Sequence, residues 1–311
     1  MSDKFENRPF GHCLAELGEK YKDIVVLDAD LQRATETNFF QESFPERYFD
    51  VGIAEANMVG MAAGFALMGK TAFCGTFSSF ISQRVCDQVV VSVAYCNANV
   101  KLMGIEPGIA SGRNGASHQA VLDIAIMHAI PNMTVFEPAD AVELRAIMAY
   151  LAATKGPAYM RVPRGNVPVI FSPDTYDFNP GKAVTVQDGD DAAIVTSGIL
   201  LPEVMKAAEV LRAKHGRHVR VLNMSSIKPF DKGAVIKAAK ETKNILTVEN
   251  HNIYGGLGSL VAETVCEDFP VRVKRMGIRD RFGEVGPEDW LLSRFGLDEA
   301  HITASTLAMI A

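Results

Sequence analysis

The stretch YFDVGIAEANMVGMAAGFALM, residues 48–68, decides the fold of this chain. It opens with a strand pattern at residues 48–51 and continues as a helix pattern at residues 55–68 that has almost no polar face. Another strand pattern, residues 71–73, follows closely. A strand, a buried helix and a second strand in succession predict part of a parallel sheet that helices cover on both faces.

The same alternation extends on both sides of this stretch. Further strands are expected at residues 24–27, 100–103, 134–136 and 158–161, and helices at residues 9–20, 82–94, 118–128 and 141–153. Pro, Gly, Asp and Ser then accumulate over residues 166–190, and a second alternating series follows. We therefore expect an α/β protein with two parallel-sheet domains, residues 1–168 and 190–311, joined by a linker at residues 169–189.

Composition excludes several classes of protein. The chain has 311 residues, 48% apolar and 22% charged, which is typical of a globular protein. Its net charge of -6 and the lack of a long basic run argue against a nucleic-acid partner. No apolar run is long enough for a membrane span, and residues 1–8 do not resemble a signal peptide. Five cysteines without metal-ligand spacing indicate reduced thiols and a cytoplasmic location.

Glu55 is the first candidate for chemistry, at the start of the apolar helix. An acid in the first turn is often only an exposed residue that the helix dipole favours. Here the helix lacks a polar face, so Glu55 is expected to be buried and to need a partner.

Three loops are weaker candidates. Residues 112–119 form a polar loop framed by glycines and ending in Ser117-His118, which could equally be a helix cap. Residues 161–166 carry two arginines at a strand end, suited to an anion or to a solvated junction. The cluster Gly255–Ser259 is expected to be a tight turn before a closely packed helix, with Glu249 and His251 at a rim or interface.

Taken together, six blocks in order resemble the C-terminal half of transketolase. They are DVGIAEANM (50–58), GTFSSF (75–80), GRNGASHQ (112–119), EPADAVE (137–143), RVPRGN (161–166) and VENHNIYGGLGS (248–259). The chain is most similar to the second, C-terminal-section subunit of transketolases encoded as two chains. This resemblance implies a thiamine-diphosphate pyrimidine-binding domain followed by a transketolase C-terminal-like domain.

The resemblance also implies roles for individual residues. Glu55 matches the glutamate that bonds the cofactor's aminopyrimidine ring, and Phe80 matches the aromatic residue that stacks on that ring. His118 matches a catalytic histidine beside the donor sugar. The remaining matches line the cofactor (Asp30 and Leu31) or the substrate (Arg8, Arg113, Asn114 and Arg164).

The implied activity is transfer of a two-carbon ketol unit from a ketose donor, expected to be phosphorylated, to an aldose. The family's diphosphate motif, GDG followed by Asn, is absent, and residues 188–190 do not supply it. A partner chain is therefore expected to carry that motif and to bind Mg²⁺ or Ca²⁺, with no metal ligand in this chain. We expect an α2β2 assembly with thiamine diphosphate at chain interfaces.

Two alternatives stay open. One is a subunit similar to 1-deoxyxylulose-5-phosphate synthase or to the β-subunit of a 2-oxoacid dehydrogenase. The other is a non-catalytic α/β binding module, which the joint presence of Glu55, Phe80 and His118 argues against.

The donor pocket departs from the usual family pattern. Ala34 stands where a phosphate-binding serine is common, and Glu106 where a histidine or arginine is common. Arg113 and Asn114 replace an acidic pair. Glu106 could pair with Arg113 and leave the phosphate site working. We favour a pocket adapted to another donor, for which xylulose 5-phosphate is a poor substrate.

Overall fold

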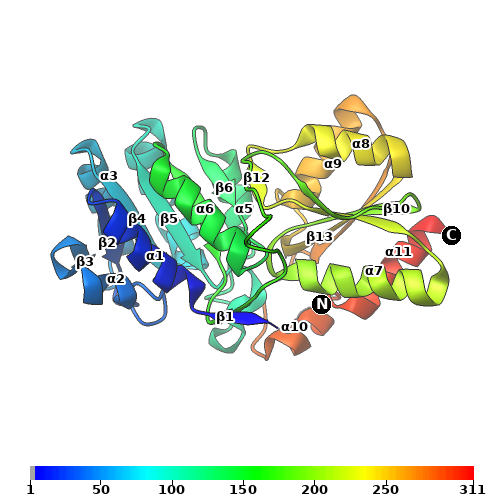
Figure 1. Cartoon of the computed structure of the whole chain (residues 1–311), viewed down its shortest axis with the longest axis horizontal. Coiled ribbons are helices and arrows are strands. Elements are labelled where there is room, and N and C mark those ends of the chain that lie inside the picture. Colours follow the sequence, from blue (N-terminus) through cyan, green and yellow to red (C-terminus); the bar gives the residue numbers. More distant parts are fainter. Residues whose placement is uncertain (1–3) are drawn as a thin grey trace. The chain divides into compact units, whose positions relative to one another are not determined.

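The structure, a computed structural model, describes residues 4–311 and forms two compact units (Figure 1). The first unit comprises the chain up to Pro107 together with Ile126–Phe178. The second comprises Gly108–Ala125 and Asn179–Ala311. Residues 108–125, which include the predicted His118 loop, thus belong with the C-terminal part of the chain.

The first unit is built on a parallel sheet. Its strands are β1 (Phe5–Asn7), β2 (Ile24–Asp28), β3 (Tyr48–Asp50), β4 (Thr71–Phe77), β5 (Val100–Ile105), β6 (Thr134–Phe136), β7 (Ala158–Val162) and β8 (Asn166–Pro168). The sheet has the order β6-β7-β5-β4-β2-β3, and each of these neighbouring pairs is parallel. Strands β1 and β8 form a separate antiparallel pair. The predicted parallel α/β fold is confirmed.

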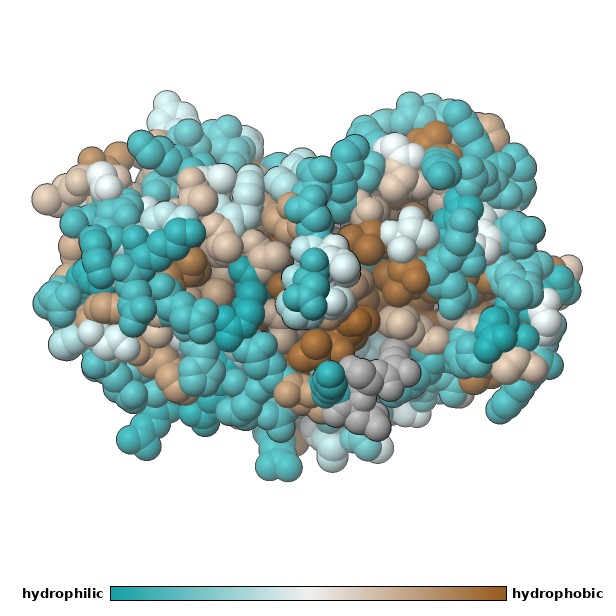
Figure 2. Space-filling view, viewed as in Figure 1, coloured by the Kyte–Doolittle hydropathy of each residue, from teal (hydrophilic) through white to brown (hydrophobic). Residues whose placement is uncertain are grey.

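Helices cover both faces of this sheet. They are α1 (Pro9–Lys20), α2 (Asn38–Ser43), η1 (Pro45–Arg47), α3 (Glu55–Leu67), η2 (Phe80–Arg84), α4 (Cys86–Gln88), η3 (Val89–Tyr95), α5 (Asp123–Ala129, which crosses into the second unit) and α6 (Ala141–Ala153). Helices α1 and α6 lie on one face, over a core that contains Ile24 and Val26 of β2 (Figure 1). Because side chains alternate along a strand, Val25 and Leu27 point to the other face, which α3 covers. On the face shown in Figure 2, hydrophilic side chains cover much of the first unit.

The second unit repeats the α/β plan with a five-stranded sheet. The strands of this sheet are β9 (Val184–Gln187), β10 (Ala192–Thr196), β11 (Val219–Asn223), β13 (Asn244–Asn252) and β14 (Arg272–Ile278), and the short strand β12 (Ser226–Lys228) lies outside it. Its helices are η4 (Ile109–Asn114), η5 (Gly198–Leu200), α7 (Leu201–His215), α8 (Lys232–Thr242), α9 (Leu257–Asp268), α10 (Glu288–Arg294) and α11 (Glu299–Ile310). The sheet order is β14-β13-β10-β11-β9, with only β9 antiparallel.

The glycine cluster before α9 is the tight, closely packed turn that the sequence predicts. Gly255 has a φ of +72°, and a Cβ on Gly256 would lie 2.1 Å from a carboxylate oxygen of Glu249. Glu249 in turn accepts a hydrogen bond from the Gly258 amide at the start of α9. The expectation that Glu249 and His251 lie at a rim is wrong, because both are fully buried beneath this turn.

The predicted helix at residues 118–128 begins only at Asp123. The preceding residues use their backbone groups elsewhere: the Ala120 carbonyl accepts from the Gly108 amide, and the Val121 carbonyl accepts from the Asn252 amide. These long-range bonds replace the first helical turn. None of the helices in residues 4–311 has the length and hydropathy that crossing a membrane requires.

Candidate functional site

The candidate residues of the first unit follow the carboxyl ends of successive parallel strands. Asp30 and Leu31 follow β2, Glu55 follows β3 and Phe80 follows β4. Ligands of open parallel sheets bind at this edge, because the loops after all the strands meet there. The sheet therefore gathers residues that are far apart in the sequence.

Glu55 is buried, as its helix predicts, with 3% of its surface exposed. Its partner is Arg84, whose Nη1 lies 2.6 Å from the Glu55 Oε1. The guanidinium of Arg84 also lies over the ring of Phe80, 4.0 Å from the ring centroid. Arg84 thus holds a buried carboxylate and an aromatic ring together, and it partly offsets the cost of burying the Glu55 charge.

Local helix geometry explains the position of Arg84. Residues 80–84 form a π-helical turn, so Phe80 and Arg84 are four residues apart on one widened turn. Such turns often occur at functional sites. The sequence predicts a helix here but gives no sign of its width, and Arg84 is a site residue that the sequence analysis missed.

Helix α3 differs from the sequence prediction on one face. Met58, Val59, Ala62 and Ala63 are buried, but Gly60, Gly64 and Leu67 are exposed. Apart from the flanking residues and the backbone of α3 itself, no described residue lies within 4 Å of a Cβ built on Gly60 or Gly64. With Ile53 and Met68, which are also exposed, these residues form an apolar surface that we call the α3 surface.

The turn that carries Asp30 and Leu31 is held by two carboxylates. Asp28 is fully buried and accepts hydrogen bonds from the Leu31 amide and from the hydroxyls of Thr35 and Thr37. Asp50 accepts from the amide of Asp30. Burial raises the pKa of Asp28, although these hydrogen bonds oppose the shift.

Arg8 and Arg164 lie beside two carboxylates. Glu36 accepts hydrogen bonds from the amides of Gly11 and Gly165, and the charges of Arg8 and Arg164 act on it. Burial is nevertheless the largest influence and raises the Glu36 pKa. Glu106 accepts from Arg164 Nη1 at 2.9 Å. The backbone φ is positive at Arg8, Asp30, Glu36 and Glu106, a strained conformation that clusters at functional sites.

Arg113, Asn114 and His118 lie on one loop of the second unit. Arg113 and Asn114 are exposed, and His118 is half-buried, with its Nδ1 2.9 Å from the Ser117 hydroxyl. The loop is fixed inside this unit by bonds such as that from the Gln119 side-chain amide to the Glu284 carbonyl. These three residues therefore lie together on one loop. Glu55 and Phe80 are linked through Arg84, and Arg8 and Arg164 both lie near Glu36.

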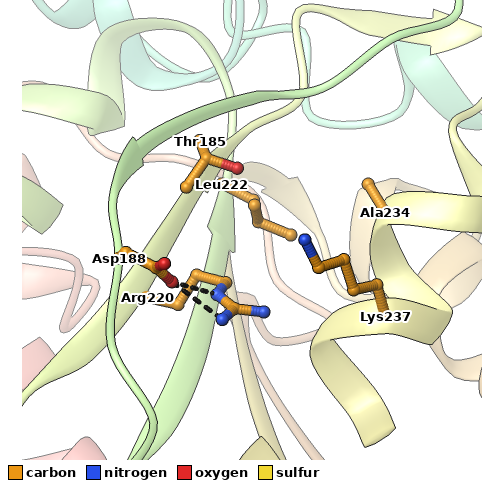
Figure 3. Close-up of a pocket in the computed structure, with 6 residues that line it drawn as sticks. All are labelled: Thr185, Asp188, Arg220, Leu222, Ala234 and Lys237. Atoms are coloured by element: carbon orange, nitrogen blue, oxygen red, sulfur yellow. Dashed lines mark hydrogen bonds and ion pairs between the residues drawn. The ribbon is translucent and has the colours of Figure 1, made fainter. Parts of the chain in front are cut away.

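A small cavity in the second unit does not compete with this site. Its volume is about 70 Å³, and its lining includes Arg220 and Lys237 (Figure 3). Arg220 is already paired with Asp188 and with Glu241. Its hydrogen bonds to Asp188 lower the pKa of that carboxyl. Asp188 therefore forms an ion pair with Arg220. The turn at residues 188–190 is tight, because a Cβ on Gly189 would lie 2.5 Å from the His218 carbonyl oxygen.

Comparison with known families agrees with this arrangement. Residues 8–169 match the transketolase pyrimidine-binding domain, and residues 181–302 match the transketolase C-terminal domain. The chain belongs to the transketolase family.

Among transketolases, subunits of two-chain proteins match this chain over nearly their full length. One is the 6-deoxy-6-sulfo-D-fructose transketolase subunit SqwH of Clostridium sp. (strain MSTE9), with 45% identity over 93% of this chain and 89% of that protein. Another is a subunit of the apulose-4-phosphate transketolase of Phocaeicola vulgatus, with 38% identity over 97% of this chain and 96% of that protein. A solved split-gene transketolase, described as an inactive β4 tetramer, superimposes with a TM-score of 0.88 at 40% identity, covering 97% of this chain and 96% of the other.

The residues of this transketolase chain fit a bound aminopyrimidine ring. Glu55 offers a buried carboxylate for a ring nitrogen, and Phe80 offers a flat ring beside it. Within residues 4–311 there is no group of three or more His, Cys, Asp or Glu side chains that could hold a metal ion.

We expect Arg84→Met to destabilise the chain by about 2 kcal/mol, because it leaves the buried Glu55 charge without its partner. In a Glu55→Gln background the same change should cost less, since no buried charge remains. Urea denaturation of the wild type, Arg84→Met, Glu55→Gln and the double variant gives the four free energies of unfolding for this comparison. Arg212→Met, which breaks the exposed pair with Glu209, is the control and should leave the free energy of unfolding nearly unchanged. Equal losses in both Glu55 backgrounds would contradict the role of the pair.

Proposed function

We propose that this chain is the C-terminal-section subunit of a two-chain transketolase that transfers a two-carbon ketol unit from a ketose to an aldose. The observation that carries the proposal is its match, over nearly the whole of both chains, to proteins named as transketolase subunits. The buried Glu55 beside Phe80 supports it, because this pair suits the pyrimidine of thiamine diphosphate.

In the proposed mechanism each residue has a distinct task. When bound, thiamine diphosphate supplies a carbanion at the C2 atom of its thiazolium ring. Glu55 holds a proton at the ring nitrogen of the pyrimidine, Phe80 fixes the plane of that ring, and Asp30 and Leu31 line it. His118 moves protons at the donor's carbonyl and hydroxyl groups.

The rest of the site orients the substrate. Arg8 and Arg164 bind the far end of the donor, because a guanidinium presents paired N–H groups to an anion. Arg113 and Asn114 contact the donor beside His118. The diphosphate and its Mg²⁺ or Ca²⁺ bind a partner chain with a GDG…N motif, in an α2β2 assembly. The five free cysteines support a cytoplasmic location.

The first test is dependence on the partner chain. A tag on this chain should recover the complex from source cells, and the complex should turn over a ketose donor. The chain produced alone should neither turn over the donor nor bind thiamine diphosphate with Mg²⁺ tightly. Adding the isolated partner should restore both properties. A ketose turned over by the chain alone would overturn the proposal.

Self-association is expected to use the α3 surface, where Gly60 and Gly64 allow a second helix to approach closely. Gly60→Leu combined with Gly64→Leu should reduce the native mass, because the new side chains occupy that space without meeting neighbours in this chain. Light scattering after size exclusion measures the mass. Gly233→Leu, at an exposed glycine of α8, is the control. An unchanged mass in the double variant would exclude this surface from the interface.

Glu55→Gln should slow exchange of the C2 proton of bound thiamine diphosphate by about 10²- to 10⁴-fold, since a positioned acid–base group is lost. Quenched hydrogen–deuterium exchange in the complex reports this step separately from sugar binding. Glu46→Gln, an exposed glutamate of the same unit, is the control. If C2 exchange keeps its wild-type rate, Glu55 has no part in the mechanism.

A further inference from the structure

The two arginines proposed to bind the donor's far end differ in whether a carboxylate already neutralises their charge. Arg164 is 2.9 Å from Glu106, so its charge is already paired. The Arg8 guanidinium has no ion pair or hydrogen bond with any side chain in residues 4–311. Within residues 4–311, Arg164 thus has a carboxylate in direct contact, whereas Arg8 interacts with the Glu36 charge without forming an ion pair.

The two nearby carboxylates also differ. Both oxygens of Glu36 accept backbone N–H groups, from Gly11 in the first turn of α1 and from Gly165, so Glu36 fixes the backbone next to both arginines. Glu106 bonds Arg164 through Oε1 only. Its Oε2 is buried and has no hydrogen-bond partner among the described residues. Glu36 therefore stabilises the backbone through both of its oxygens, whereas the Glu106 Oε2 atom forms no such bond among the described residues.

Glu106 is also held in a costly conformation. It follows β5 directly with a φ of +53°, and its amide donates to the Val162 carbonyl. A positive φ is unfavourable for a glutamate, and it persists only where surrounding contacts impose it. Here the conformation keeps a negative charge next to Arg164 in the donor pocket.

We propose that Glu106 is a specificity-determining residue that makes the donor site prefer a ketose ending in a monoanion, such as a sulfonate, over one ending in a phosphate dianion. The inference rests on the proposed transketolase function. A phosphate ester carries close to two negative charges at neutral pH, since its second pKa is about 6. Its second charge would face the Glu106 carboxylate, whereas a sulfonate's single charge matches Arg8, which forms no ion pair with residues 4–311.

Three six-carbon donors that differ only at C6 test the proposal on the two-chain complex. They are 6-deoxy-6-sulfo-D-fructose, D-fructose 6-phosphate and D-fructose, and kcat/KM is measured for each with one aldose acceptor. The wild type should prefer the sulfonate to the phosphate by about tenfold or more at pH 8. Lowering the pH to about 5.5 should narrow this ratio, because the phosphate then carries a single charge.

Removing the Glu106 charge should remove the preference. Glu106→Gln should raise kcat/KM for D-fructose 6-phosphate by about tenfold while leaving D-fructose nearly unchanged. Glu106→Asn is a second variant that accepts a positive φ more readily, which guards against misfolding. Glu16→Gln, which also breaks an arginine–glutamate pair of the first unit, is the control and should leave the ratio as it was.

Two results would overturn the inference. One is a wild-type preference for the phosphate, and the other is a sulfonate-to-phosphate ratio that neither Glu106 variant changes. Hydroxypyruvate, which carries the ketol unit without a sugar end, separates this failure from a failure of the proposed function. If the complex turns over hydroxypyruvate but does not prefer the sulfonate donor to the phosphate donor, only the role of Glu106 is contradicted. No turnover with any donor contradicts the transketolase function itself and the inference with it.

Discussion

The common direction of the strands in the first unit is the constraint on which the candidate site depends. Strands β2, β3, β4, β5 and β7 are parallel, so their carboxyl ends lie at one edge of the sheet. Each of these strands leads directly into a candidate residue or the loop that carries it. Glu106 after β5 and Arg164 after β7 are neighbours for this reason alone. An antiparallel strand among them would move its loop to the opposite edge.

Burial then sets the chemistry at that edge. Asp28, Glu36 and Glu55 are carboxyl groups with little or no exposure to water, and each is bonded to groups of the first unit. Asp28 and Glu36 accept mainly hydroxyl and amide N–H groups, which fix loop conformations. Glu55 has instead a half-exposed guanidinium, that of Arg84, as its partner. A partner that reaches toward solvent can move when a ligand arrives, whereas a backbone amide cannot.

Much of the fold could be predicted from the sequence because the apolar patterns are strong. The strands at β2 and β6 and the helices α1 and α6 lie where the sequence predicts them, and the burial of Glu55 follows from the apolar helix that it begins. The misses share a physical cause. Arg84, Glu36 and the turn before α5 depend on partners distant in the sequence, and Glu249 is buried by a glycine turn whose packing no local pattern reveals.

The assignment of residues 108–125 to the second unit limits how these proteins can exchange parts. A single crossover near residue 180 would transfer most of the second unit to a new background but leave this segment behind. Gln119, on the same loop as His118, Arg113 and Asn114, would then face a Glu284 partner of different ancestry. Functional hybrids between relatives should therefore need two crossovers, so that this loop is inherited together with the C-terminal sequence that supports it.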